Sequence, residues 1–341
     1  ADTVQPYIMA VTEIDVQEFL STDGGEAAIK KEWDAMTVPG LGMQRARLVE
    51  MSDAESKQYT DTKGKAFKQV LKLRYACTVK RATPEQLDLD PNAKGKDKAR
   101  LVAQDLKLLN PADAVDTYAP VPEGSVFRLM VAAHPIIDWD VSATDVTTAY
   151  LQGDPFPYDA SKPKAGQWVA CKVYDPQQKR WRFMWMTGEI YGRQPAGCNW
   201  HKTLTKKHQN VGMEEGKNAK SIYYKETRNV KTAVHVDDPV NYSKRTKPYP
   251  EESSHKLEYY KALSAQLDLK EIETLSTDQD LDYLSLRMSL SNDSEVCISN
   301  ADFVFKVVER HGMTGCNPAT TSISKDLLKI VGKEAELGLF L

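Results

Sequence analysis

No apolar run in the sequence is long enough to cross a membrane. The longest, within "FRLMVAAHPIIDW", is interrupted by Arg128 and His134 and falls short of the roughly 20 residues that a transmembrane helix needs. The N-terminus lacks the basic segment and apolar core of a signal peptide, and it begins without Met, so we expect a processed or fragmentary start. These absences predict an intracellular protein, cytoplasmic or nuclear, with no membrane span.

Cysteine is scarce and scattered. The 341 residues hold five cysteines, an odd number, and no two of them form a CxxC pair. They stand at Cys77, Cys171, Cys198, Cys297 and Cys316. This pattern predicts reduced thiols in an intracellular setting and argues against a zinc site.

Neither sign of charge dominates the chain as a whole. Its 45 Lys and Arg against 48 Asp and Glu give a formal net charge of −3, which argues against a generic nucleic-acid binder. The distribution is uneven, however: the segment from Lys63 to Lys107 holds twelve basic and five acidic residues. Such a segment can face phosphates even when the whole chain is acidic, although a solvated charged surface is an equal alternative at this stage.

The periodicity of apolar residues predicts a mixed α+β chain. Helical spacing marks residues 26–36, 123–135, 251–267 and 301–312, with Ser125 as an expected N-cap and Asn300 and Gly312 as an expected cap pair. The stretch 191–213 is expected to turn through Pro195 and Gly197 into a further helix. Alternation predicts strands over residues 66–82, 99–107, 139–151, 167–174, 180–191, 232–244 and 294–300. Hairpins are expected for 167–174 with 180–191, for the two halves of 232–244, and for the basic strands 66–82 and 99–107.

Three carboxylates stand out from this background. Asp145 lies in "SATDVTTAYLQGD", a strand-like stretch in which an acid is costly without a cation, and Asp237 and Asp238 lie at the expected hairpin turn. If the two strands are neighbours, the carboxylates converge and repel each other unless a cation lies between them. Hard oxygen ligands favour magnesium, and two such ions suit phosphoryl transfer. A plain type I′ turn is the alternative interpretation of "VDD".

Seven stretches give this constellation a context. In chain order they are "KARLVAQ", "DTYAPVPEGSVFRLMVAAHP", "WDVSATDVTTAYLQGD", "IYGRQPAGCNWHKTL", "AVHVDDPV", "STDQDLDYLSLRM" and "VCISNADFVFKVVERHGMTGCNPATTSIS". Their order and content resemble the reverse transcriptase of copia-type LTR retrotransposons, and "AIKKEWDAM" matches that family's lead-in helix. The resemblance runs collinearly from about residue 26 to residue 324.

The resemblance implies a right-hand polymerase fold with fingers, a palm built on an antiparallel sheet, and a thumb. The implied limits are a helical lead-in over 1–60, fingers over 61–140, a palm over 141–245 and a thumb-like part over 246–341. The implied activity is RNA-directed DNA polymerase, a nucleotidyltransferase that acts on an RNA template, a DNA primer and dNTPs. Two Mg²⁺ ions, with Mn²⁺ as an alternative, are the implied cofactors, and self-association or a larger assembly stays open.

The resemblance also assigns roles to individual residues. It makes Asp145, Asp237 and Asp238 the catalytic triad and metal ligands, with the backbone carbonyl of Val146 completing a metal shell. For the nucleotide it implies that Tyr150 excludes a ribose 2′-hydroxyl, that Lys98 and Arg100 neutralise the triphosphate, and that Gln194 lies nearby. A core aromatic residue is the alternative for Tyr150, and an exposed charged loop is the alternative for the two cations.

Four departures from the family pattern support a second interpretation. His235 replaces an aromatic residue before Val-Asp-Asp, Pro239 directly follows the Asp pair, the stretch 193–199 is altered, and the segment after Gly153 is short. Proline is tolerated mainly at sheet edges and turns. The alternative function is therefore a catalytically inactive, domesticated reverse-transcriptase fold that serves as a structural, assembly or nucleic-acid-binding subunit.

Overall fold

A computed structural model of the chain describes the residues 13–39, 46–61, 66–67, 70–80, 95–105, 116–133, 135–136, 138–176, 178–284, 286–291 and 295–310. The chain divides into two compact units. The large unit spans Ala10–Ser299 and contains three sheets. The described part of the small unit is essentially the helix α8 (Ala301–Arg310), where Val304 N–H donates to the Asn300 carbonyl at 3.0 Å.

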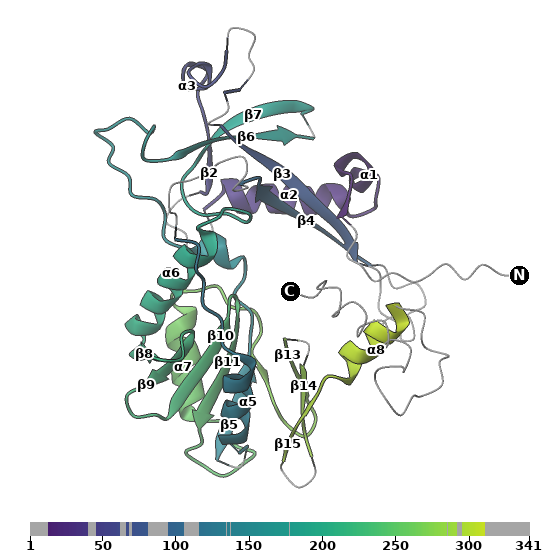
Figure 1. Ribbon diagram of the computed structural model, residues 1–341, viewed down its shortest axis with the longest axis vertical. Helices are drawn as coiled ribbons and strands as arrows, with labels where there is room; N and C mark the ends of the chain where they lie inside the picture. Colours follow the sequence, from purple (N-terminus) through teal and green to yellow (C-terminus); the bar gives the residue numbers. More distant parts are fainter. Residues whose placement is uncertain are drawn as a thin grey trace, which may run out of the picture. The chain divides into compact units, whose positions relative to one another are not determined.

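The first sheet has six strands in the order β1-β3-β6-β7-β2, with β4 paired to β3 (Figure 1). Its strands are β1 (Glu13–Ile14), β2 (Leu48–Glu50), β3 (Leu71–Lys80), β4 (Lys96–Ala103), β6 (Val169–Asp175) and β7 (Arg180–Met186). Strands β6 and β7 pair antiparallel, which confirms the predicted hairpin, and β3 pairs parallel to β6. One face of the sheet carries the apolar residues that form the core of this region.

Helices α1 (Val16–Leu20) and α2 (Gly25–Thr37) cover that apolar face. Ile29 and Met36 of α2 are buried against Leu73 and Leu101, and Trp33 packs at the edge of the same cluster. The helical spacing read from the sequence is therefore confirmed, because those residues form the buried side of α2. The short helix α3 (Asp53–Lys57) begins at Ser52 in a capping box with Glu55.

The second sheet has the order β12-β5-β11-β10-β9-β8. Its strands are β5 (Trp139–Ala143), β8 (Met213–Glu215), β9 (Ile222–Lys225), β10 (Val230–His235), β11 (Asp238–Lys244) and β12 (Glu273–Thr274). Strands β10 and β11 form the second predicted hairpin, and β5 pairs antiparallel to β11. The two segments that carry the three carboxylates are thus neighbours in one sheet.

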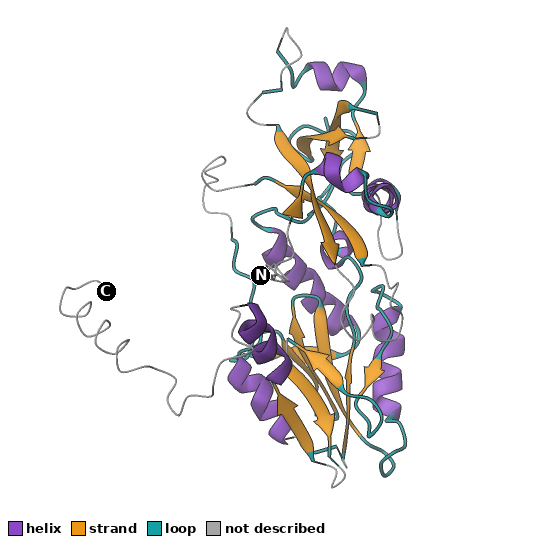
Figure 2. Ribbon diagram, turned by 90° about the vertical axis from the view of Figure 1, so that its right-hand side faces the viewer, coloured by secondary structure: helices purple, strands orange, loops and turns teal. Residues whose placement is uncertain are grey.

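Helices lie on both faces of this second sheet (Figure 2). Helix α5 (Gly124–Ala133) packs Phe127 and Met130 on one face, together with β13 (Leu281–Tyr283) and β14 (Leu286–Leu290). Helices α6 (Ala196–Asn210) and α7 (Ser254–Ser264) bury Trp200 and Tyr259 against the other face. Strand β15 (Val296–Ser299) pairs with β14 to complete a third, three-stranded sheet.

Two local predictions are wrong in their boundaries. The strand expected over 139–151 ends at Ala143, so Asp145 lies beyond the strand rather than within it. The backbone of Thr148 has a positive φ of 47°, and a 3₁₀ helix follows over Ala149–Gln152. The segment after Ala143 is therefore not extended as a strand would be. Helix α5 begins at Gly124, so Ser125 lies in its first turn and is not the N-cap.

Several expectations lie outside the described residues, including the structure of the charged loop 83–94, Gly312 and Cys316. Among the described cysteines, Cys77, Cys171, Cys198 and Cys297 form no disulfide. No helix in the described ranges is both long enough and apolar enough to span a membrane.

Candidate active site

The turn between β10 and β11 presents the Asp pair. His235 and Asp238 are the closing pair of the hairpin, and Val236 and Asp237 are its two central residues. Of these two, only Val236 has a positive φ, at 60°. A type I′ turn needs positive φ at both central positions, so the type I′ turn considered for "VDD" is wrong. A β-branched residue in this conformation is a strained position.

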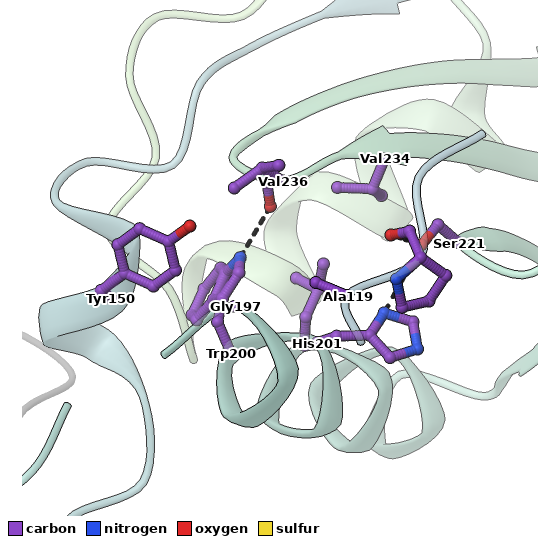
Figure 3. Close-up of a pocket in the computed structure, with 10 residues that line it drawn as sticks. Ala119, Tyr150, Gly197, Trp200, His201, Ser221, Val234 and Val236 are labelled. Atoms are coloured by element: carbon purple, nitrogen blue, oxygen red, sulfur yellow. Dashed lines mark hydrogen bonds between the residues drawn. The ribbon is translucent and has the colours of Figure 1, made fainter. Parts of the chain in front are cut away.

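Tertiary contacts hold that strained turn in place. The indole N–H of Trp200 on α6 donates to the Val236 carbonyl at 2.6 Å (Figure 3). Val236, Trp200 and Tyr150 line the same narrow cavity, which has a volume of about 20 Å³, the size of a single water molecule. Because Trp200 is buried, the turn is anchored to a rigid helix rather than left to solvent.

Pro239 fits the hairpin without breaking it. Val234 lies opposite Pro239, and its own N–H donates to Ser221 on the β9 side at 2.9 Å. Residues 234 and 239 are therefore a pair that does not exchange hydrogen bonds across β10 and β11, so the missing N–H of Pro239 removes no rung between these strands. The Pro239 carbonyl instead accepts from the Thr144 N–H at 3.2 Å.

The segment after β5 is held against the tip of the hairpin. The Val146 N–H donates to the backbone carbonyl of Asp237 at 2.7 Å, which places Asp145 beside the Asp pair. On its other side, the Lys270 N–H donates to the Asp145 carbonyl at 2.9 Å, and the Thr144 hydroxyl donates to the Lys270 carbonyl at 2.9 Å. These hydrogen bonds on both sides fix the backbone position of Asp145.

Lys270 is the cationic partner of Asp145, which could not be identified from the sequence. Its ammonium donates to Oδ2 of Asp145 at 2.6 Å. The side chain of Lys270 is 59% exposed and that of Asp145 is 35% exposed. Solvent screens a pair this exposed, so the bond contributes on the order of 0–1 kcal/mol and can be exchanged for another partner.

Among the described residues, neither Asp237 nor Asp238 forms an ion pair like that between Asp145 and Lys270. Partial burial, followed by the charge of Asp145, raises the pKa of Asp237, while Arg100 and His235 oppose the rise. Burial and then the charges of Asp237 and Asp145 raise the pKa of Asp238 to about 6. The three carboxylates therefore interact electrostatically, and cations nearby compensate them only in part.

The carboxylates match the ligand chemistry of a hard divalent cation, but they are not gathered as a finished site. Within the described ranges, no three Asp, Glu, His or Cys side chains lie close enough together to hold a metal ion. The donor type fits magnesium. Burial first, and then the charges of neighbouring carboxylates, raise the pKa values of Asp237 and Asp238, and a bound cation would favour their ionised forms. One oxygen of Asp145 is engaged by Lys270 and would have to be released.

A comparison with protein-family models decides the family. Residues 85–325 match the model described as reverse transcriptase (RNA-dependent DNA polymerase), the copia-type branch identified from the motifs. The chain belongs to this reverse transcriptase family. The match covers more than half of the chain, including the end of β5, the β10–β11 hairpin and Lys270. A search of curated proteins finds no match.

Two of the residues expected to bind nucleotide in a reverse transcriptase lie next to the turn. The guanidinium carbon of Arg100 lies 5.1 Å from the centre of the Tyr191 ring, and the charge of Arg100 acts on Asp237. Tyr150 packs edge-on against Tyr191 with ring centres 5.3 Å apart, and it is half-buried. Burial and then the charge of Asp237 raise the pKa of Tyr150. Tyr191 thus links Arg100 to Tyr150.

The other two expected nucleotide residues lie in different surroundings. Lys98 is half-buried on β4, opposite Thr78, so it belongs to a strand rather than to an exposed loop. The backbone N–H of Gln194 donates to Asp105 at 3.3 Å, and the side-chain amide donates to the same carboxylate at 3.5 Å. Arg193 also faces Asp105, at 3.6 Å, so an internal acid holds the altered 193–199 stretch.

Sequence reasoning missed Lys270 and Trp200. Lys270 ends the alternating stretch "LDLK", in which Leu267 is buried, so the pattern indicates only that Lys270 lies on the polar side. Nothing in that stretch points to a residue 125 positions earlier. Trp200 lies in the motif "IYGRQPAGCNWHKTL", but its bond to the turn depends on how α6 packs, which the motif alone does not reveal.

Proposed function

We propose that this chain is an RNA-directed DNA polymerase whose catalytic carboxylates are Asp145, Asp237 and Asp238. The observation that carries the proposal is that the fold brings these three acids together: β5 pairs with β11, and the Val146 N–H donates to the Asp237 carbonyl at 2.7 Å, so Asp145 lies beside the β10–β11 turn. Burial raises the pKa of both members of the Asp pair, and the charge of Asp145 raises both further. Mutual repulsion of this kind has no structural benefit, and a site that binds cations gives it a use.

The chain's own groups would divide the work between charge and shape. Two divalent ions, when bound, would stabilise the attacking and leaving oxygens of nucleotidyl transfer. Asp145, Asp237 and Asp238 would hold these ions, with the Val146 carbonyl as a further oxygen ligand. Arg100, whose charge acts on Asp237 and whose guanidinium lies over the Tyr191 ring, would neutralise part of the triphosphate, with Lys98 on the same strand, β4.

Tyr150 and Gln194 would shape the nucleotide pocket. Tyr150 packs edge-on against Tyr191, which supports a role in which its ring would exclude a ribose 2′-hydroxyl. Gln194 would have to leave Asp105, or else act through its backbone, to reach the nucleotide. In the same scheme we assign a lead-in to 1–60, fingers to 61–140, a palm to 141–245 and a thumb to 246–341. An RNA template, a DNA primer and dNTPs would be the substrates.

Primer extension tests the proposal directly. The purified chain, a DNA primer on an RNA template, dNTPs and Mg²⁺ or Mn²⁺ should give extended primer. Asp237→Asn should abolish extension because it removes a metal-ligating charge while keeping the shape of the side chain. Asp282→Asn, which changes an acid whose side chain is 74% exposed on β13, is the matched control and should leave extension intact. No extension by the parent protein with either ion would contradict the proposal.

The Lys270 contact supports a second candidate, an inactive fold that serves as a scaffold or nucleic-acid-binding subunit. In such a protein the ammonium would replace the metal permanently, as its 2.6 Å bond to Asp145 allows. Thermal melts separate the candidates. In the enzyme, Mg²⁺ at millimolar concentration should raise the melting temperature of the parent and not of Asp145→Asn. In the scaffold, both proteins should be indifferent to Mg²⁺.

A further inference from the structure

Arg47 is a fully buried cation, with 1% of its surface exposed, that the proposed mechanism does not use. It directly precedes β2, and its backbone is tied to the first sheet. The Thr187 N–H donates to the Arg47 carbonyl at 2.9 Å, and the Thr187 hydroxyl donates to the Ala46 carbonyl at 2.6 Å. A buried guanidinium is costly unless its N–H groups find acceptors. The positions of those acceptors therefore show what this side chain does.

The acceptors are backbone carbonyls at the end of the 3₁₀ helix Ala149–Gln152. Nε of Arg47 donates to the Leu151 carbonyl at 2.8 Å, and Nη2 donates to both the Leu151 and the Gly153 carbonyls. A helix leaves its last carbonyls without partners of its own, and a cation is favourable at that end. A 3₁₀ helix this short has weak internal hydrogen bonds, so Arg47 holds in place a turn that needs tertiary support.

Arg47 keeps its charge in this buried position. Burial lowers its pKa to about 10, while the carboxylates of Glu189 and Asp154 oppose the fall. Glu189 is itself buried, and it accepts from the Asn199 amide on α6 at 2.8 Å and from Arg193 at 3.3 Å. The guanidinium is therefore a cation at neutral pH, and the acid that compensates it is anchored to α6.

Tyr150 lies inside the turn that Arg47 holds. The Tyr150 carbonyl accepts from the Gly153 N–H at 3.3 Å, and the next residue, Leu151, is fully buried. The Tyr150 ring lines the same cavity as Val236 of the β10–β11 turn (Figure 3). The position of this ring beside the Asp pair thus follows from the position of the short helix.

We propose that Arg47 is a positioning residue for nucleotide selection: by holding the Leu151 and Gly153 carbonyls, it sets how strictly Tyr150 excludes a ribose 2′-hydroxyl. The inference rests on the proposed function, which assigns Tyr150 to the sugar. Discrimination by a single oxygen atom requires the excluding group to be held to within about 0.5 Å. The bonds from Arg47 supply this constraint from the first sheet, on which the arginine backbone is fixed.

Gly188 keeps open the space in which the guanidinium lies. A Cβ atom at position 188 would lie 2.0 Å from Nη1 of Arg47, and the next two atoms that it would meet belong to the same side chain. A methyl group there would therefore displace the end of Arg47 and would meet no backbone atom first. Gly188→Ala thus moves the guanidinium away from the two carbonyls without removing its charge.

Selection between a deoxyribonucleotide and a ribonucleotide tests the proposal. Single incorporation opposite a template U gives kcat/KM for dATP and for ATP. Gly188→Ala should lower the dATP-to-ATP ratio about 10- to 100-fold, the size of effect that a displacement of about 1 Å has at a reacting site. Arg47→Met should act in the same direction, and Arg47→Lys, which keeps a cationic donor, should restore part of the ratio.

The ratio separates positioning from a general loss of structure. A variant that is merely less stable would lower both rates together and leave the ratio unchanged, and an unchanged ratio in a folded Gly188→Ala would overturn the proposal. Gly124→Ala, where a Cβ atom meets nothing within 4 Å, is the matched control and should keep the parent ratio.

A double-mutant cycle tests whether Arg47 acts through Tyr150. Tyr150→Ala removes the excluding ring, so the addition of Gly188→Ala should lower the ratio no further. If the two changes instead lowered the ratio independently, Arg47 would not act through Tyr150 and the proposal would be overturned.

Hydrogen exchange distinguishes failure of this inference from failure of the proposed function. In the protein without metal, primer or nucleotide, the N–H groups of Leu151 and Gly153 should exchange about fivefold faster in Gly188→Ala, the effect of losing one typical hydrogen bond on local opening. Exchange as slow as in the parent would overturn the inference even in an active polymerase. A parent that extends no primer would overturn the proposed function, and faster exchange in the variant would still support the hold of Arg47 on the turn.

Discussion

An Asp–Lys pair lies near each end of β5, one at Asp140 within the strand and one at Asp145 just beyond it, and the two pairs differ in burial and in the charges around them. At one end Asp140 is fully buried beside Lys256 at 3.5 Å and Arg245 at 3.8 Å, and these side chains are at most 4% exposed. Asp140 also accepts the Ser253 N–H at 2.9 Å, which fixes the start of α7. At the other end Asp145 and Lys270 are partly exposed, and two further acids lie close by.

This difference indicates a structural role for the Asp140 end and is consistent with a functional role for the Asp145 end. At the Asp140 end, Lys256 and Arg245 share the buried acid Asp140, and Lys256 also pairs with Glu252 and bonds Thr274 at 2.9 Å, so removing Asp140 leaves buried cations short of negative charge. The Asp145 end has more acids than cations, an exchangeable ion pair and a valine in a strained backbone conformation. Unfavourable features gathered at one place are typical of a functional site, which the rest of the fold stabilises.

The largest effect should come from the buried end. Asp140→Ala leaves Lys256 and Arg245 without their shared acid inside the protein, and we expect a loss of about 3–5 kcal/mol in the free energy of unfolding. Urea denaturation measures it. Asp34→Ala, which breaks the exposed pair with Lys30, is the control and should cost less than about 1 kcal/mol. A loss as small as in the control would mean that the two ends of β5 do not differ.

Asp145→Asn should have the opposite profile. It removes an exposed ion pair and also relieves repulsion at the Asp pair, so we expect the free energy of unfolding to change by less than about 1 kcal/mol. Primer extension should nevertheless be lost. Lys270→Met provides the matched comparison, since it removes the cation and leaves all three acids. If Asp145→Asn instead unfolded as readily as Asp140→Ala, the site would be a structural ion pair.

The sequence was sufficient for the parts of the fold that repeat a local pattern. The period of Ile29 and Met36 predicted α2, and the alternation around "RWRFMWM" predicted a hairpin. The sequence pattern did not predict boundaries that depend on tertiary contacts. Strand β5 ends at Ala143 because the following residues bond to the β10–β11 turn and to the segment around Lys270. For the same reason Lys270 could not be found as the partner of Asp145. The roles of the three acids and of the nucleotide residues stay predictions.

The titration of Asp238 gives a pH-dependent test of the comparison. Its pKa is raised to about 6 in the folded protein, against about 3.9 for an unperturbed Asp, so the folded state holds the proton more tightly. Between about pH 4 and pH 6 the folded state therefore binds more protons than the unfolded state, and stability falls as the pH rises. Asp238→Asn should remove this fall.

Thermal melts of the parent and Asp238→Asn from pH 4 to pH 7 measure it. The melting temperature of Asp238→Asn should exceed that of the parent by an amount that grows as the pH rises and then stays constant above pH 6. Mg²⁺ should narrow the gap in the proposed enzyme, since a bound cation favours the ionised acid. Parallel curves over the whole range would show that Asp238 is not under strain from its neighbours.

The smallest effect should come from relieving the backbone at the turn. Val236→Gly places at a φ of 60° the residue that adopts positive φ most readily, and it keeps the carbonyl that accepts from Trp200. We expect a gain of about 1 kcal/mol in the free energy of unfolding, the lower end of the strain such a residue stores. Val234→Gly, in the adjacent buried strand with ordinary backbone, is the control and should lose stability. Extension should fall in Val236→Gly despite the added stability, because a flexible turn holds Asp237 less firmly against Asp145. A variant that is both less stable and equally active would show that Val236 is not strained and that its conformation does not position the acids.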